Sequence, residues 1–254
     1  MRGLYAIVDT DTLSKRGVAV LPFVEAVLDA RPAAMQLRDK SGGARATLEL
    51  LRAMAPLCAR AGVPLFANDR PDLALLARCD GVHLGQEDVP AAVARMLWVT
   101  EAGAEAEAGA GAGAEAGAGA GAGAGSRLRI GLSTHNAEDV EAALLEELDY
   151  IAVGPIFPTG SKDRPSPVVG LAALASFAAR IREVRPGLPI VAIGGISLET
   201  AGEVGAVADC VAVIGALFPE REIDVEGSRS VALDLDAVRA RARALHAAVL
   251  RGRA

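Results

Sequence analysis

Two acidic residues are the first candidates for chemistry in this chain. Asp69 lies in "NDRPD" and Asp88 in "GQED", and each stretch follows a short apolar run. If these runs are neighbouring strands of a parallel sheet, the two carboxylates converge on one point. Two hard oxygen ligands, with water and phosphate completing the shell, are how proteins usually hold Mg²⁺. Either aspartate alone could cap the helix that follows it, but the pair favours a magnesium site.

Three cationic residues, Arg38, Lys40 and Lys162, are expected beside this metal site. The chain has only one further lysine, Lys15, among its 26 basic residues. Arginine binds phosphate in two-pronged fashion, whereas lysine acts as a point charge that can follow a moving group. Any one of the three could be a solvated loop charge. Together they predict a ligand that carries more than one phosphate charge, such as a pyrophosphate.

A second anion site is predicted from glycines. "AIGGIS" contains Gly194 and Gly195, and "AVIGAL" contains Gly215, and an apolar run leads into each. In such loops the backbone N–H groups and a helix N-terminus can cradle one phosphate. Each glycine could instead serve only to form a turn, but two such loops favour a monophosphate site.

No nucleophile–base pair stands out in the sequence. His135 follows an apolar run and could act in proton transfer, Ser133 could donate hydrogen bonds, and His83 is predicted to be core or wall. Two phosphate sites and a Mg²⁺ without a nucleophile predict a transfer driven by departure of pyrophosphate. The protein would then act by orienting its ligands and stabilising charge.

The elements that must position these residues alternate along the chain. Short apolar runs, several rich in Val or Ile, are typical of strands buried on both faces, and stretches with helical spacing separate them. The expected strands are Leu4–Val8, Ala33–Leu37, Pro64–Ala67, Gly81–Leu84, Leu128–Leu132, Tyr150–Val153, Ile190–Ile193 and Val211–Ile214. Among the expected helices are residues 45–62, Asn136–Leu148, Leu171–Val184 and Leu235–Leu250.

Eight such units predict an α/β fold, a single-domain (β/α)₈ TIM barrel over residues 1–254. An open Rossmann-like sheet is the weaker alternative because no glycine fingerprint follows the first strand. In a barrel the functional residues follow the strands, and the candidate residues above do so. Residues 219–254 are expected to form a polar connection and the final helix.

The run "EAGAEAEAGAGAGAEAGAGAGAGAG", residues 101–125, interrupts this pattern. It falls between the fourth expected helix and the fifth strand, at the end of a barrel opposite the catalytic loops. Frequent glycine and sparse side chains predict a disordered insertion. A domain linker and a silk-like repeat are the alternatives, and the barrel pattern on both flanks disfavours them.

Composition limits the function classes. The net charge is −6 and the pI near 5.2, which argues against a nucleic-acid or anionic-membrane surface. The three cysteines are scattered, as expected of buried thiols in a reducing compartment. No leader and no membrane-spanning run is recognised, so a cytoplasmic protein is expected.

Taken in order, the motifs resemble those of the thiamine-phosphate synthases. They are "QLRDK", "ND", "HLGQED", "GLSTH", "GPIFPTGSKD", "AIGGIS" and "VAVIGA", spread from about Leu4 to Phe218. The resemblance implies Mg²⁺-assisted, dissociative joining of a pyrimidine diphosphate to a thiazole phosphate, with release of pyrophosphate. It implies small-molecule partners, neither nucleic acid nor membrane, and leaves a homo-oligomer open.

The resemblance also implies roles for individual residues. The implied Mg²⁺ ligands are Asp69 and Asp88, and the implied catalytic residues are Arg38, Lys40, Ser133 and Lys162. The pyrimidine diphosphate is assigned to Gln36, Arg38, Asp39, Lys40, Asn68, Ser133 and Lys162. The thiazole phosphate is assigned to Thr159, Gly160, Ser161, Gly195, Ile214 and Gly215.

Two positions depart from the family pattern. Ser161 stands where threonine is usual, and Gly215 where serine is common, and both changes are expected to loosen the monophosphate site. A thiazole tautomerase on the same barrel, using His135, is one alternative function. The other is a non-catalytic phosphate-binding protein whose working part is the 101–125 run.

Overall fold

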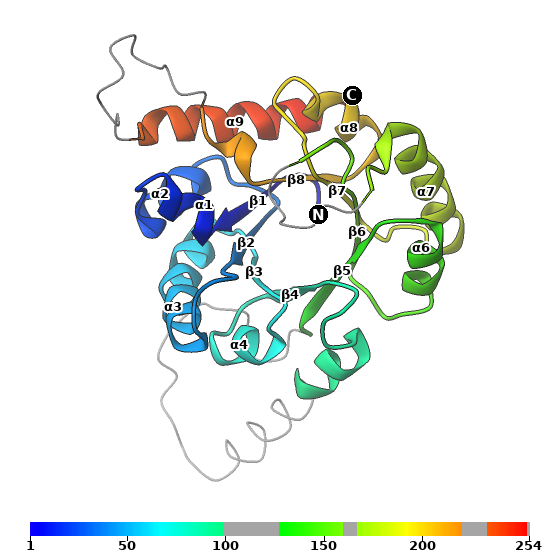
Figure 1. Ribbon diagram of the computed structural model, residues 1–254, viewed down its shortest axis with the longest axis horizontal. Helices are drawn as coiled ribbons and strands as arrows, with labels where there is room; N and C mark the ends of the chain where they lie inside the picture. Colours follow the sequence, from blue (N-terminus) through cyan, green and yellow to red (C-terminus); the bar gives the residue numbers. More distant parts are fainter. Residues whose placement is uncertain (99–126, 160–166, 220–232, 253–254) are drawn as a thin grey trace.

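The chain folds into a closed barrel of eight parallel strands with helices outside. The computed structural model describes residues 1–98, 127–159, 167–219 and 233–252. Strand order around the barrel follows the sequence from β1 to β8, and β8 pairs with β1 to close it. Figure 1 looks into this ring, with the strands at the centre and the helices around them. The predicted (β/α)₈ barrel is therefore confirmed.

Every expected strand is present, with ends within about two residues of the prediction. The strands are β1 (Gly3–Asp9), β2 (Ala34–Arg38), β3 (Leu65–Asn68), β4 (Gly81–Leu84), β5 (Arg129–Thr134), β6 (Tyr150–Val153), β7 (Ile190–Ile193) and β8 (Cys210–Val213). Almost all of their residues are buried, since helices cover one face and the barrel interior fills the other.

The helices cover the outer face of the barrel. They are α1 (Thr10–Lys15), α2 (Val20–Leu28), α3 (Ala44–Ala61), α4 (Pro71–Leu76), α6 (Ala137–Leu144), α7 (Gly170–Val184), α8 (Ala201–Val207) and α9 (Leu235–Arg251), with a 3₁₀ turn η1 at Gly215–Leu217. Residues 91–98 are also helical. The expected final helix is α9, and the 101–125 run lies outside the described residues.

One expected helix is shorter than its apolar pattern. Helical spacing continues to Leu148, but α6 ends at Leu144. The side chain of Asn136 caps its start by accepting a hydrogen bond from Asp139 N. After Leu144 the chain turns back towards the barrel, and Asp149 accepts a hydrogen bond from Ile130 N on β5 at 2.9 Å. Pairing of β6 with β5 therefore takes precedence over the last turn of helix.

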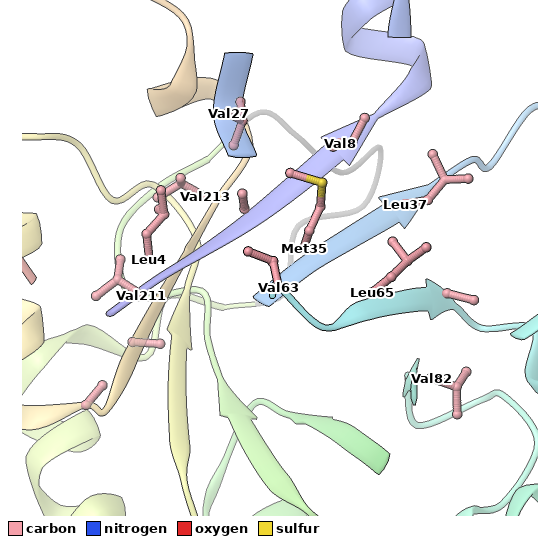
Figure 2. Packing of buried hydrophobic residues seen from close by; sticks show 14 of the residues in the cluster. Leu4, Val8, Val27, Met35, Leu37, Val63, Leu65, Val82, Val211 and Val213 are labelled. Atoms are coloured by element: carbon pink, nitrogen blue, oxygen red, sulfur yellow. The ribbon is translucent and has the colours of Figure 1, made fainter. Parts of the chain in front are cut away.

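Two apolar clusters hold the barrel. The larger lies between strands and helices and includes Leu4, Met35, Leu37 and Val211 with Val27 of α2 (Figure 2). The smaller fills the barrel interior and contains Tyr5, Phe66, Tyr150, Val191 and Ala212. The burial of both clusters stabilises the fold through the hydrophobic effect. The three cysteines are buried free thiols, as expected.

The final helix packs against the outside of the first strand. α9 packs on α8, α2 and β1. His246 Nδ1 accepts a hydrogen bond from Leu4 N at 3.3 Å. Gly3 has a φ of 115°, and a Cβ there would lie 2.6 Å from the His246 ring. Among the described helices, none has the length and apolar character to cross a bilayer.

Candidate active site

A pocket of about 400 Å³ opens at the carboxyl ends of the strands, and residues from all eight strands or the loops after them line it. This is the end of the barrel at which the sequence places the functional residues. The pocket collects the following predicted residues: Gln36, Arg38, Lys40, Asn68, Asp69, Asp88, Ser133, Thr159, Gly195, Ile214 and Gly215. Gly160, Ser161 and Lys162 lie outside the described residues.

The acidic pair is brought together as the strand order predicts. β3 and β4 are neighbours, and the Asp69 N–H donates to His83 O at 2.8 Å, one step beyond the last strand pair. Burial, followed by the contact with the Asp69 carboxyl, raises the pKa of Asp88, while the Gly85 N–H and Lys40 oppose this effect. A carboxylate whose charge is disfavoured by burial and by a neighbouring carboxyl suits a bound cation.

Asp69 has an unusual backbone. Its φ is 62°, in the left-handed region that few residues other than glycine occupy, although aspartate tolerates it better than most. The residue stands at the turn from β3 to α4, where Pro71 opens the helix. This turn directs the chain so that the Asp69 side chain lines the pocket. Unusual backbone at a site residue is consistent with a functional constraint.

No group of three or more potential metal-binding His, Cys, Asp or Glu side chains occurs in the described parts of the chain. Asp69 and Asp88 thus form a pair of protein ligands at most. Mg²⁺ commonly binds one or two carboxylates and completes its shell with water and substrate phosphate, so the pair fits this ion.

Two cationic side chains are held on the same wall by acids. Arg38 Nη1 donates to Asp9 Oδ2 in an ion pair whose aspartate is 5% exposed. Asp9 also caps α1 by accepting from Thr12 N at 2.8 Å, so it is fixed on both sides. Lys40 pairs with Asp69, and its side chain is half-exposed. Arg38 is therefore rigidly placed, whereas Lys40 keeps room to move.

Asp39, between these two cations, lies apart from the pocket. Its carboxylate accepts hydrogen bonds from Thr10 Oγ1 and Thr47 Oγ1, each at 2.7 Å, and from Gly42 N at 3.1 Å. Asp39 therefore ties the loop after β2 to α1 and α3, and it is the described candidate that does not line the pocket. Residues alternate in direction along an extended chain, which turns Asp39 away while Arg38 and Lys40 face inward.

Side-chain amides complete this wall. Gln36 Nε2 donates to Asn68 Oδ1 at 2.6 Å across the β2–β3 pair. This bond leaves Gln36 Oε1 and Asn68 Nδ2 available to a ligand. Gln86 Nε2 donates to Ser133 O at 2.6 Å and links the loop after β4 to β5.

A chain of polar side chains that sequence reasoning missed runs below Ser133. His83, expected to be core or wall, forms part of the pocket wall, and its Nε2 lies 2.9 Å from Ser133 Oγ. Its Nδ1 lies 2.9 Å from the hydroxyl of Tyr150, which lies 2.9 Å from that of Tyr5. The available signal was that Tyr5 and Tyr150 are the only tyrosines in the chain and both lie within expected strands.

The glycine loops after β7 and β8 form the opposite wall. Gly194 and Gly195 have φ of 101° and 66°. A Cβ on Gly195 would lie 2.5 Å from Pro158 O, so only glycine lets this loop rest on the loop after β6. Ile214 immediately precedes the η1 turn and Gly215 begins it. Backbone N–H groups at this end of a barrel can bind an anion.

Two arginines that the sequence did not single out flank these loops. Arg16 and Arg241 line a second hollow that shares Ser197 and Gly215 with the main pocket. The Arg16 guanidinium lies 4.3 Å from the centre of the Phe218 ring. Arg241 Nε is buried and has no hydrogen-bond partner among the described residues. Glu199 lines the same hollow, so one of the two positive charges is offset and the hollow keeps a net positive charge that attracts anions.

His135 also lines the main pocket, but it is tied to the backbone. Its Nδ1 contacts Gly154 O, and its N–H donates to Asp139 Oδ2 at 2.8 Å. A carbonyl oxygen can only accept, so Nδ1 carries the proton of this bond.

Comparison with known proteins identifies the family. The sequence pattern of the family described as thiamine monophosphate synthase matches residues 4–102 and 111–217, most of the chain. The chain belongs to this family. The break in the match, residues 103–110, falls within the 101–125 run, and the family pattern matches on both sides of this break.

Individual thiamine-phosphate synthases agree with this assignment. That of Koribacter versatilis is 38% identical over 224 residues, which is 85% of this chain and 88% of that protein. That of Methanospirillum hungatei is 34% identical over 222 residues, 87% of this chain and 92% of that protein. The solved thiamine phosphate pyrophosphorylase of Pyrococcus furiosus superposes with a TM-score of 0.70 at 26% identity, covering 98% of this chain and 96% of that one.

The family is one of transferases in thiamine biosynthesis, and this chain has the same fold. The two alternative functions, a thiazole tautomerase and a non-catalytic phosphate-binding protein, find no support in these comparisons.

Proposed function

We propose that this thiamine-phosphate synthase joins 4-amino-5-hydroxymethyl-2-methylpyrimidine diphosphate to 4-methyl-5-(2-phosphoethyl)thiazole. The bond between the pyrimidine methylene carbon and the diphosphate oxygen breaks, and the thiazole nitrogen forms a new bond to that carbon. The products are thiamine phosphate and pyrophosphate. The observation that carries this proposal is the layout of one pocket. An acidic pair and two cations lie on one wall, and glycine loops of the kind that bind phosphate lie on the other.

The diphosphate would lie at the β2–β4 wall. Asp69 and Asp88 would hold Mg²⁺, which supplies positive charge to the departing pyrophosphate. Arg38, fixed by Asp9, would bind one phosphate group in a constant position. Lys40 would move from Asp69 to the leaving group, because metal binding engages that carboxylate. Lys162 remains the third cation assigned to this end.

The pyrimidine would lie between the amide pair and Ser133. Gln36 Oε1 can accept a hydrogen bond from an exocyclic amine, and Asn68 Nδ2 can donate to an acceptor on the substrate. Holding the methylene carbon in a fixed place shortens the path to the attacking nitrogen, which is how positioning accelerates a substitution.

The thiazole phosphate would lie against the loops after β7 and β8. We assign its phosphate to the backbone N–H groups near Gly195, Ile214 and Gly215 and to the Thr159 hydroxyl. Gly160 and Ser161 are assigned to it by the family resemblance alone. Arg16 and Arg241, opposed by Glu199 alone among the charged residues lining the adjoining hollow, favour an anion here and would offset the absence of a hydroxyl at Gly215.

The deciding experiment is a coupling assay with the two phosphorylated precursors, with Mg²⁺ and with excess EDTA. We expect thiamine phosphate and pyrophosphate in equal amounts, and only with Mg²⁺. A matched incubation with the thiazole phosphate alone follows its isomerisation. Isomerisation without coupling would assign the protein to the tautomerases, and neither reaction would leave a binding protein.

We also infer that the enzyme works on free small molecules in the cytoplasm, without nucleic acid or membrane as partner. Three buried free thiols and a negative net charge support this inference. A homo-oligomer remains compatible with it, and light scattering on the purified protein measures that state.

A further inference from the structure

Three hydrogen bonds in series connect the barrel interior to the pocket. They run from Tyr5 Oη to Tyr150 Oη, from Tyr150 Oη to His83 Nδ1, and from His83 Nε2 to Ser133 Oγ, each 2.9 Å long. Tyr5 and Tyr150 are 2% and 1% exposed, and His83 and Ser133 are partly buried. The chain crosses from β1 to β6 and then through β4 to β5, so it exists only in the closed barrel.

The direction of these bonds follows from counting hydrogens. Each phenol carries one hydrogen, and burial raises the pKa of both tyrosines far enough that they stay neutral. Tyr5 Oη has one hydrogen-bond partner in the described structure, the hydroxyl of Tyr150. A buried donor without an acceptor is costly, so Tyr5 donates to Tyr150.

The remaining bonds then have one arrangement. Tyr150 Oη accepts from Tyr5, and among the residues that the structure describes the acceptor for its own hydrogen is His83 Nδ1. Nδ1 is therefore unprotonated, and the imidazole carries its hydrogen on Nε2. Nε2–H donates to Ser133 Oγ, so the hydrogen of the Ser133 hydroxyl is left to point elsewhere. Ser133 lines the pocket, where a ligand can accept that hydrogen.

We propose that His83 is a positioning residue, held by Tyr150 and Tyr5 as the Nε2–H tautomer, which makes the Ser133 hydroxyl a committed hydrogen-bond donor to the substrate. The opposite polarity would have Ser133 donate to His83 and would leave the buried Tyr5 hydroxyl without an acceptor. The state of His83 is independent of the proposed function. Only the nature of the acceptor, an atom of the pyrimidine diphosphate, rests on it.

Nitrogen NMR of protein labelled with ¹⁵N-histidine tests the tautomer directly. The chain has three histidines, so His83→Gln identifies the His83 signals by their loss. At neutral pH we expect His83 to show a protonated Nε2 and an unprotonated Nδ1. Tyr150→Phe removes the donor to Nδ1, so we expect its spectrum to show a mixture of tautomers. A protonated Nδ1 in the wild type, alone or as imidazolium, overturns the proposal.

Kinetics test whether the network acts through Ser133. Losing one neutral hydrogen bond that orients a donor is expected to lower kcat of Tyr150→Phe by roughly five- to tenfold. His83→Gln keeps an N–H donor at a similar distance from Ser133 and should retain more activity than His83→Phe. In a Ser133→Ala background, Tyr150→Phe should cost nothing further, since coupled residues are non-additive.

Phe66→Leu serves as the matched control. The Phe66 ring lies 5.8 Å from that of Tyr5 and 5.6 Å from that of Tyr150, measured between centroids, and it makes no hydrogen bond to either. We expect this change to leave the His83 tautomer unaltered and to add independently to Ser133→Ala. Full additivity of Tyr150→Phe with Ser133→Ala refutes the positioning role. If the wild type shows no coupling activity, the proposed function is refuted, while the NMR result on the His83 tautomer still holds.

Discussion

Gln36 Nε2 lies 2.6 Å from Asn68 Oδ1, so the amides at the ends of β2 and β3 hold each other in one orientation. Asn68→Asp keeps the acceptor for Gln36 but removes the Nδ2 donor and adds negative charge beside the diphosphate. We expect kcat/KM for the pyrimidine diphosphate to fall roughly 10- to 100-fold, the cost of losing a hydrogen bond to a charged group. Steady-state kinetics with each substrate varied in turn measure this.

Asn136→Asp is the control for that variant. The same exchange at the N-cap of α6 keeps the oxygen that accepts from Asp139 N, and Asn136 lies outside the pocket lining. We expect its kinetics to match the wild type. Equal losses in both variants would contradict a specific role for the Asn68 amide.

The acidic pair makes a prediction about Mg²⁺ dependence. Asp69→Asn or Asp88→Asn removes one of two carboxylates. Losing even a residue that only supports a metal ligand costs at least about tenfold in metal affinity, so we expect the Mg²⁺ concentration for half-maximal rate to rise at least about tenfold. Asp72→Asn, in an exposed pair with Arg70, should leave the Mg²⁺ dependence unchanged. Titration of rate against Mg²⁺ separates these outcomes, and an unshifted curve for both pocket variants contradicts the metal assignment.

The loop after β7 depends on glycine. In Gly195→Ala the new Cβ meets Pro158 O at 2.5 Å, and the φ of 66° is unfavourable as well. We expect the KM for the thiazole phosphate to rise more than the KM for the pyrimidine diphosphate, together with a lower Tm. Gly62→Ala has nearly the same φ, 68°, but no atom within 4 Å of its Cβ. It should lose stability by about 1–2 kcal/mol without the change in KM, and a KM shift in both variants would remove the case for this loop.

His246 predicts part of the pH dependence of stability. Burial lowers its pKa from the ordinary value of 6.5. The unfolded chain therefore binds this proton more readily than the folded one. The contribution of His246 to the free energy of unfolding is fully present above pH 6.5 and is lost as the pH drops towards the folded pKa. In His246→Gln this contribution is absent, and urea unfolding between pH 5 and 8 should show a shallower pH dependence. Parallel curves for the two proteins would contradict the assignment.

We expect the protein to tolerate deletion of the 101–125 run. The chain leaves the barrel after the helical residues 91–98 and returns at β5, at the amino ends of the strands. Arg95 bonds Leu128 O at 3.0 Å and so anchors this return without the run. Loop entropy changes slowly with length. Replacing residues 101–125 with a short turn should leave kcat and Tm near those of the wild type, and a large loss of either would show that the run has a role of its own.

Much of the site could be predicted from sequence because a parallel barrel turns order into position. Arg38 ends a strand and Asp69 and Asp88 follow strands, and the strands of one barrel end at one rim. Asp39 shows the limit of that reasoning. It stands between Arg38 and Lys40, yet Thr10, Thr47 and Gly42 bind its carboxylate away from the pocket. Which neighbour captures a carboxylate depends on loops that the apolar pattern leaves undefined.

The sequence by itself determined the eight strands and the residues at their ends. The spacing of apolar residues and the polar residues that interrupt it are local properties of the chain. Only the tertiary structure decided the contacts between strands far apart in order. Tyr5 meets Tyr150 across the barrel interior, and Arg16 meets Phe218 beside the loop after β8. The His83 ring is oriented by Tyr150, 67 residues away. Closure of the barrel creates these pairs, and no spacing along the chain encodes them.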